Sequence, residues 1–194
     1  MTEEIVTPVE LTPFQRILRG RRSIRRYLPT PVERETLLAC LEAARLAPSA
    51  HNAQPWRFIV VDDPDLKERL TAAAFSGNYS GSKFAAQAPI ILLLLVKTEL
   101  MAHGLGGRLQ RVPFHFIDIG IAGEHIVLQA EELGLATCWM GWFNYRKARK
   151  VLGIPRKYKV MAMMPVGYAE KRPRREPPRR TLDEIVTFNG IERE

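Results

Sequence analysis

One run of residues dominates the pattern of hydrophobic and polar positions along the chain. Residues 89–96 read PIILLLLV, without a single polar side chain. The run is far shorter than the ~20 residues that a membrane-spanning helix needs, and a short, continuous apolar run is typical of a strand buried on both faces. We therefore expect a central buried strand here and no membrane association.

Start and stop signals place the other elements around this strand. Thr12-Pro13-Phe14-Gln15 combines an N-cap, a proline at the first helical position and a glutamine that closes a capping box, and Gly20 ends the helix. The same signals recur at Thr30-Pro31-Val32-Glu33. The pattern predicts further helices over 63–74, 115–133 and 144–152, strands over 56–61, 135–140 and 158–166, and loops over 75–83 and 101–113.

This order of elements bounds the fold class. Helices and strands alternate without a clean βαβ rhythm, and no glycine-rich turn joins a first strand to a first helix, which argues against a Rossmann dinucleotide site. We expect one domain over 1–194, an α+β fold of three layers with a central mixed sheet flanked by helices, in which 170–194 form a C-terminal arm. Gly120, Ala122 and Gly123 predict that a second helix or a partner subunit packs closely on the helix over 115–133.

The formal net charge of +8 is concentrated in two clusters. Residues 16–26 hold six arginines and no acid, and residues 171–180 hold six basic groups and one acid. Such clusters suit a nucleic acid, an anionic membrane or a phosphorylated small molecule. The two cysteines, Cys40 and Cys138, are too few for a disulfide framework and indicate free thiols in a reducing cytoplasm.

Three segments are candidates for binding a ligand. If 21–25 are extended, Arg21, Ser23 and Arg25 share one face and form a phosphate site; the alternative is a solvated basic stretch. The turn over 47–56 offers hydroxyl and amide groups to a ligand. The strand that ends at Gly141 lets a flat ligand approach the backbone, and the preceding Cys138 is either a nucleophile or a small buried hydrophobe.

These segments together resemble the nitroreductase family of FMN-dependent oxidoreductases. The resemblance rests on their order: RRSIRRY, APSAHNAQPWRFIVV, PIILLLLV, GLATCWMGWF, PVGY and a late arginine pair before LDEIV. It implies a nitroreductase-like fold and an intertwined homodimer with FMN at the subunit interface. A serine that is common in the family is replaced here by Ala50.

The resemblance also assigns roles to residues. It gives the FMN phosphate and ribityl chain to Arg21, Arg22, Ser23 and Arg25, with Arg179 and Arg180 completing the phosphate site. Pro48, Ser49, Ala50 and Asn52 would contact the flavin from the other subunit. The backbone of Trp139, Met140 and Gly141 would lie along the isoalloxazine ring, with an amide of Met140 or Gly141 donating towards N5 or O4. Lys83 is a candidate contact for the nicotinamide or for an anionic substrate.

The activity implied is ping-pong transfer of hydride equivalents from NADH or NADPH, through FMN, to nitroaromatics, quinones or related conjugated acceptors. FMN carries the chemistry, so the protein needs no catalytic acid or base and no metal. The family also includes flavin reductases and deiodinases. Two other hypotheses are a non-catalytic flavin-binding sensor and a basic nucleic-acid-binding module, although the chain has no recognition helix or zinc pattern.

Overall fold

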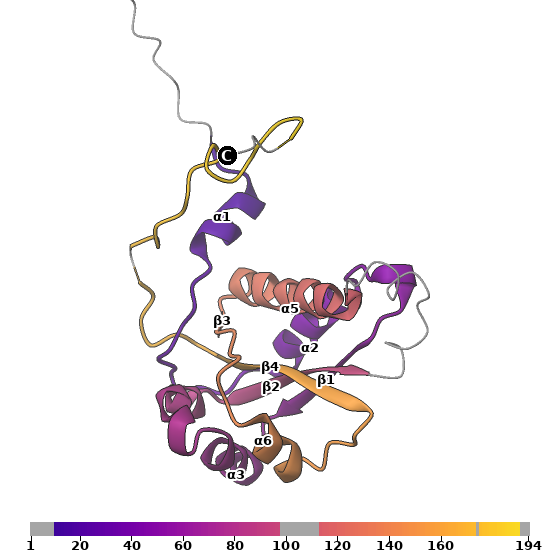
Figure 1. Ribbon diagram of the computed structural model, residues 1–194. Coiled ribbons are helices and arrows are strands. Elements are labelled where there is room, and N and C mark those ends of the chain that lie inside the picture. The colour runs from indigo at the N-terminus through magenta and orange to yellow at the C-terminus, as the bar shows by residue number, and fades with distance from the viewer. Residues whose placement is uncertain (1–9, 98–112, 174, 191–194) are drawn as a thin grey trace, which may run out of the picture.

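A four-stranded sheet lies between two layers of helices (Figure 1). The computed structural model describes residues 10–97, 113–173 and 175–190, so most of the stretch expected to be irregular at 101–113 lies outside the described residues. In chain order, the elements are α1 (Pro13–Gly20), α2 (Arg34–Arg45), the 3₁₀ turn η1 (Ala50–Asn52), β1 (Trp56–Val61), α3 (Pro64–Ala74), the 3₁₀ segment η2 (Gly77–Gln87), β2 (Ile90–Lys97), α5 (Phe114–Glu132), β3 (Ala136–Thr137), α6 (Tyr145–Val151) and β4 (Tyr158–Gly167).

The apolar run forms β2, an interior strand of the sheet, as its composition predicts. The strand order is β1-β2-β4-β3 and every ladder is antiparallel. Leu92 and Leu94 face the core beneath α2 and α5, whereas Ile91 and Leu93 face the core beside α3 and α6. Successive side chains of a strand point to opposite faces, so a strand covered on both sides must be apolar at every position. The expected three layers are confirmed.

We expected a mixed sheet, but the sheet contains very little parallel pairing. Within the described ranges, the parallel pairing consists of one isolated bridge between Ser23 and Thr137. This bridge attaches the arginine-rich segment to the edge strand β3. It therefore places the first charge cluster at that end of the sheet.

Three helices begin where their capping residues predict. Thr12 accepts the Gln15 N–H at 3.2 Å and donates its own N–H to the Gln15 side chain at 2.9 Å, so both halves of the capping box are present. Asp63 caps α3 through the Leu66 N–H at 2.8 Å. Asn144 caps α6 in the same way. These bonds satisfy backbone donors that a helix cannot pair internally.

The second helix begins later than its sequence signals indicate. Thr30 does not cap it, and α2 begins at Arg34 with Glu33 as the N-cap. The preceding residues are extended because the Leu28 N–H donates to the Tyr168 carbonyl. The Tyr168 hydroxyl also donates to the Glu33 carboxylate at 2.7 Å. This pairing with the end of β4 overrides the local preference for an earlier helix start.

Two other segments differ from the prediction. From Gly77 on, the loop expected at 75–83 belongs to η2. There the Ser82 hydroxyl donates to the Trp142 carbonyl, and the Trp142 indole donates to the Asn78 carbonyl. The strand expected over 135–140 shrinks to β3, after which Met140 pairs again with Met163 as an isolated bridge. Contacts distant in sequence decide both outcomes.

Helix α1 lies beyond α5, away from the sheet, and the arm runs from the sheet end of the molecule towards the same side (Figure 1). No residue of α1 is buried. The arm begins beside the first charge cluster, where the Glu170 N–H donates to the Arg26 carbonyl. Arg172 then holds the arm against the end of α5, with its Nη1 2.6 Å from Glu131 Oε2. No helix in the described ranges is long and apolar enough to cross a membrane.

Candidate functional site

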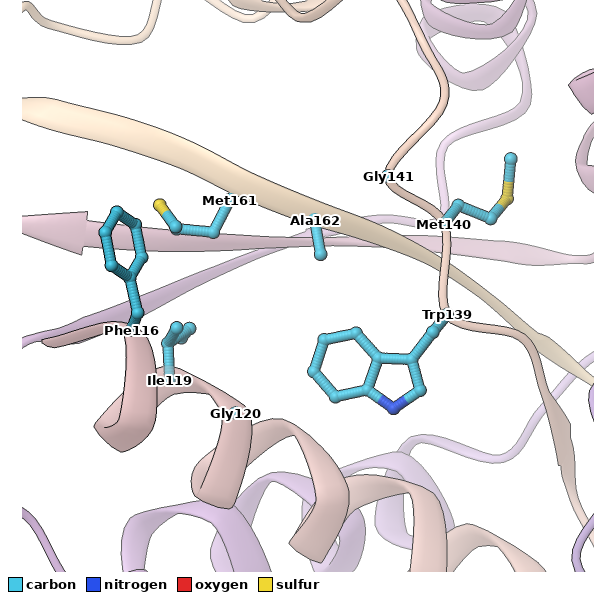
Figure 2. A pocket seen from close by; sticks show the side chains of 8 residues that line it. All are labelled: Phe116, Ile119, Gly120, Trp139, Met140, Gly141, Met161 and Ala162. Atoms are coloured by element: carbon cyan, nitrogen blue, oxygen red, sulfur yellow. The ribbon is translucent and has the colours of Figure 1, made fainter. Parts of the chain in front are cut away.

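A cavity of about 290 Å³ lies between α5 and the segment that follows β3. Its lining combines one face of α5 with two adjacent backbone segments: Phe116, Ile119, Gly120, Trp139, Met140, Gly141, Met161 and Ala162. Figure 2 shows Phe116 and Met161 at one end of the opening and Trp139 at the other. The walls are almost wholly apolar. Such a cavity suits a flat hydrophobic ring more than a charged group.

Trp139 forms one wall because α5 has a glycine at the facing position. A Cβ on Gly123 would lie 2.2 Å from Cη2 of the Trp139 indole and 2.8 Å from a Leu94 methyl carbon. The indole N–H donates to Glu124 Oε2 at 3.0 Å. The close packing expected at the small residues of α5 is therefore made at Gly123 by a side chain of the same subunit. Gly120, one turn earlier, borders the cavity, and a Cβ added there would meet no atom within 4 Å.

Two arginines of the first charge cluster, Arg21 and Arg25, act on Cys138 together with Ser23. Cys138 directly precedes Trp139. Burial raises the pKa of the Cys138 thiol, against the opposing effects of Arg25, of a hydrogen bond with Ser23 and of Arg21. The alternation expected of an extended 21–25 segment therefore brings Arg21, Ser23 and Arg25 to one place. A buried thiol with a raised pKa is a poor nucleophile at neutral pH, which favours the interpretation of Cys138 as a small hydrophobe.

The side chains of Arg22, Arg25 and Lys83 each have different surroundings. The Arg22 guanidinium bends back to donate to the carbonyls of Arg19 and Arg21 at the end of α1. The Arg25 guanidinium lies 5.9 Å from the centre of the Phe84 ring, which stacks it against η2. Lys83, the residue before Phe84, is exposed and does not line the cavity. Arg22 thus supports the backbone beside the cluster, whereas Arg25 is fixed with its charge near Cys138.

The turn after α2 is tightly held and carries unusual backbone angles. His51, Asn52 and Gln54 all have φ between 45° and 53°, a region that non-glycine residues adopt at a cost and that often marks functional loops. The Ser49 hydroxyl accepts the Gln54 N–H at 2.9 Å. The Asn52 side chain accepts the Gln54 amide at 3.0 Å. These polar groups therefore stabilise the turn itself.

A buried carboxylate joins this turn to α5. Asp118 is only 4% exposed and accepts the Ala50 N–H at 3.0 Å. Pro48, which precedes the turn, is exposed. The turn is not among the segments that line the cavity of its own chain. Its assignment to the flavin site of the other subunit accordingly stays a prediction.

Lys159 and His115 both contact the ring of Phe116, which lines the cavity. The Lys159 ammonium lies 4.8 Å from the centre of the Phe116 ring. Burial lowers the pKa of His115, Lys159 lowers it further, and Asp118 opposes both. The His115 Nε2 atom is buried and has no hydrogen-bond partner in the described part of the chain. The imidazole is therefore neutral at physiological pH, with a nitrogen left to bind.

The late arginine pair does not join the first cluster within one chain. Arg179 donates only to the carbonyl of Pro178, and among the described residues no hydrogen bond or ion pair links Arg179 or Arg180 to residues 21–25. Both arginines are exposed on the arm. The assignment of Arg179 and Arg180 to the phosphate site therefore stays a prediction.

Sequence and structure comparisons identify the family of this arrangement. A sequence model described as the nitroreductase family matches residues 18–83 and 78–168. The chain belongs to the nitroreductase family. It is 34% identical over 174 residues to an NADH dehydrogenase of Thermus thermophilus, with 76% of this chain and 82% of that protein covered. An iodotyrosine deiodinase of Thermotoga neapolitana is 27% identical over 191 residues, covering 89% and 96% of the two chains.

A solved structure supports the same assignment. The FMN-dependent nitroreductase of Clostridium difficile superposes with a TM-score of 0.71 at 31% identity, covering 90% of this chain and 98% of that one. Proteins of the nitroreductase family are oxidoreductases, and this class therefore holds for the chain described here. The nitroreductase-like α+β fold expected from the sequence is confirmed.

Phe116 and Ile119 shape this nitroreductase site but were not predicted, and Gly120 and Gly123 were predicted only as positions of close packing. The four residues lie on one helix face, where positions repeat every three or four residues. This spacing is the sequence signal from which that face of α5 could have been predicted. The support that Asp118 gives to the turn and Arg172 gives to the arm depends on contacts distant in sequence, so no local signal announces them.

Proposed function

We propose that this nitroreductase-family protein binds FMN with the ring in the α5 cavity and transfers hydride equivalents from NADH or NADPH to nitroaromatic or quinone acceptors. Two observations support the proposal: an apolar cavity is bounded by 139–141, and Arg21, Ser23 and Arg25 act on Cys138, the residue directly before Trp139. Cationic donors and an apolar cavity joined by one short segment suit a ligand with an anionic phosphate at one end and an aromatic ring at the other.

The residues present fit such a ligand. The Ser23 hydroxyl and the two guanidinium groups are donors suited to phosphate oxygens. Of the two amides considered for the ring, the Met140 N–H already donates to the Met163 carbonyl at 2.9 Å. Gly141 is therefore the candidate donor towards the ring, and the lack of a side chain there lets a planar group approach the backbone.

When bound, FMN supplies the hydride chemistry. The chain supplies binding, orientation and electrostatics around it. Arg21 and Arg25 hold the phosphate, while Trp139 and Phe116 bound the ring space and keep water away from it. Lys159, whose ammonium lies near the Phe116 ring, adds positive charge beside the cavity. Because the nicotinamide and the acceptor would meet the same bound FMN in turn, we expect ping-pong kinetics.

Purified protein is expected to be yellow, or to become so on addition of FMN, and then to oxidise NADH or NADPH only when a quinone or nitroaromatic is supplied. Absorbance spectra and steady-state kinetics with each nicotinamide, run against menadione and a nitrofuran, make this measurement. Iodotyrosine as acceptor provides a parallel arm, because one relative is named a deiodinase. A protein that binds FMN but oxidises neither nicotinamide would instead be a flavin-binding sensor, and a colourless protein that takes up no FMN would contradict the proposal outright.

We also propose that the active species is a cytoplasmic homodimer in which α1 and the arm pack against the partner subunit. Phe188 is 86% exposed and Leu182 is 72% exposed on the arm, and Phe14 and Leu18 of α1 are also exposed. An apolar surface of this kind on an isolated chain is typical of a subunit interface. A partner would also bring its own 48–52 turn and Arg179 and Arg180 to the site. Both cysteines are buried and free, in keeping with a reducing compartment.

Phe188→Glu is expected to weaken the dimer by at least about tenfold, since burying a phenylalanine contributes roughly 1.5–3 kcal/mol. Sedimentation equilibrium over a range of protein concentrations measures the change. Thr187→Glu is the control, because it places the same charge at the neighbouring exposed position. A flavin-loaded monomer in the wild type would show that the partner contributes nothing to the site.

A further inference from the structure

A third basic cluster remains outside the site described above. Residues 144–160 contain seven basic side chains and no acidic one: Arg146, Lys147, Arg149, Lys150, Arg156, Lys157 and Lys159. The segment therefore carries seven positive charges, comparable to each of the two clusters described above. The cluster covers α6 and the turn that leads into β4.

Four of these cations border one cavity. It measures about 510 Å³ and is lined by Arg146, Arg149, Lys150, Gly153, Ile154, Pro155 and Arg156. Ala148 and Ile154 belong to the core on the α3 and α6 side of the sheet, so the cavity lies across the sheet from α5. It shares no lining residue with the cavity assigned to FMN.

Arg149 is fixed in place by a reciprocal pair of hydrogen bonds with Ile154. Its carbonyl accepts the Ile154 N–H at 3.0 Å, and its Nε donates to the Ile154 carbonyl at 2.9 Å. Its Nη2 atom is nevertheless buried and has no hydrogen-bond partner in the described part of the chain. The Arg149 guanidinium therefore keeps its positive charge at the wall of the cavity, with no acidic partner in the described part of the chain.

The other three cations are not neutralised by the described part of the protein. Arg146 donates to the Tyr145 hydroxyl at 3.2 Å and stacks on the same ring. In the described ranges, neither Lys150 nor Arg156 forms an ion pair. The dipole of α6 favours cations in its last turn, but it does not account for Arg156, which lies beyond the helix, or for the cavity. Four like charges around one hollow repel each other until a counter-charge enters.

We propose that this cavity is a second binding site, for a ligand with two or more linked phosphate groups. Three guanidinium forks match phosphate oxygens better than a single carboxylate, and the number of cations calls for more than one negative charge. The volume lies within the range of small-molecule sites. The site does not depend on FMN binding, because its residues and its position on the sheet are different.

Calorimetric titration of the full chain with inorganic pyrophosphate tests the proposal. With FMN bound, so that its own phosphate site is filled, we expect one pyrophosphate per chain. We expect at least tenfold weaker binding in the double variant Arg146→Gln/Arg156→Gln, whose altered side chains are exposed. The control Arg34→Gln/Arg57→Gln removes the same charge from exposed positions elsewhere and is expected to bind like the wild type. Binding must also persist in Arg21→Gln/Arg25→Gln, which separates this site from the FMN phosphate site.

Two further arms identify the source of the phosphate groups. ADP that binds more tightly than pyrophosphate would indicate a nucleotide ligand, whereas equal affinities would indicate recognition of the diphosphate alone. Undiminished pyrophosphate binding in Arg146→Gln/Arg156→Gln overturns the proposal. So does binding of a single-stranded RNA without any binding of pyrophosphate, because the segment would then be a polyelectrolyte surface instead of a small-ligand site.

Discussion

Replacing Arg21 and Arg25 together with glutamine is expected to weaken FMN binding about 100-fold or more. Hydrogen bonds to a charged partner contribute roughly 1.5–3 kcal/mol each, and 1.4 kcal/mol corresponds to a factor of ten. Both guanidinium groups act on the buried Cys138 thiol, the residue directly before Trp139 of the cavity wall. Quenching of flavin fluorescence on titration with apoprotein measures the affinity.

The double variant Arg19→Gln/Arg26→Gln is the matched control. It removes the same two charges from exposed positions of the same segment, neither of which acts on Cys138. Equal losses of FMN affinity in the two double variants would show that only the overall charge of the segment matters. The assignment of Arg21 and Arg25 to the phosphate would then fail.

Gly123→Ala is expected to destabilise the protein by about 1–3 kcal/mol, the usual cost of overpacking a core. The added carbon would overlap the rim of the Trp139 indole and a Leu94 methyl group. The indole would have to leave α5 and give up its hydrogen bond to Glu124. Urea unfolding measures the change in stability, and a shift in tryptophan fluorescence reports the displaced indole.

Gly120→Ala provides the comparison within the same helix. Its Cβ would meet no atom within 4 Å, and alanine is favoured over glycine in a helix by up to about 1 kcal/mol. The two substitutions are chemically identical, so opposite changes in stability isolate the packing of Trp139 on Gly123. If Gly123→Ala were as stable as Gly120→Ala, the indole would not be held against α5 in solution.

Features that depend on a local pattern were predictable from the sequence. The capping residues Thr12 and Asp63 set the starts of their helices, because each cap bonds a backbone group three residues away. The apolar run of β2 required cover on both faces. The prediction that Arg21, Ser23 and Arg25 share a face likewise required only that the segment be extended.

Features that depend on distant contacts were not predictable. The start of α2 is moved to Arg34 by pairing with Tyr168, more than 130 positions along the chain. In the sequence, Asp118 looks like an ordinary helical aspartate. Only the folded structure shows that it accepts the Ala50 N–H. The cavity beside Arg149 arises because the turn after α6 returns Ile154 to that side chain, which a count of charges cannot reveal.

The position of β2 in the sheet also has a consequence for the order in which the chain is made on the ribosome. β1 precedes β2 closely, so one edge of β2 is paired soon after synthesis. The other edge waits for β4, which begins only at Tyr158. Until then the most apolar strand of the chain presents an open row of hydrogen-bonding groups, the kind of edge through which nascent chains associate. The yield of native protein therefore depends on how quickly translation covers the segment between Lys97 and Tyr158.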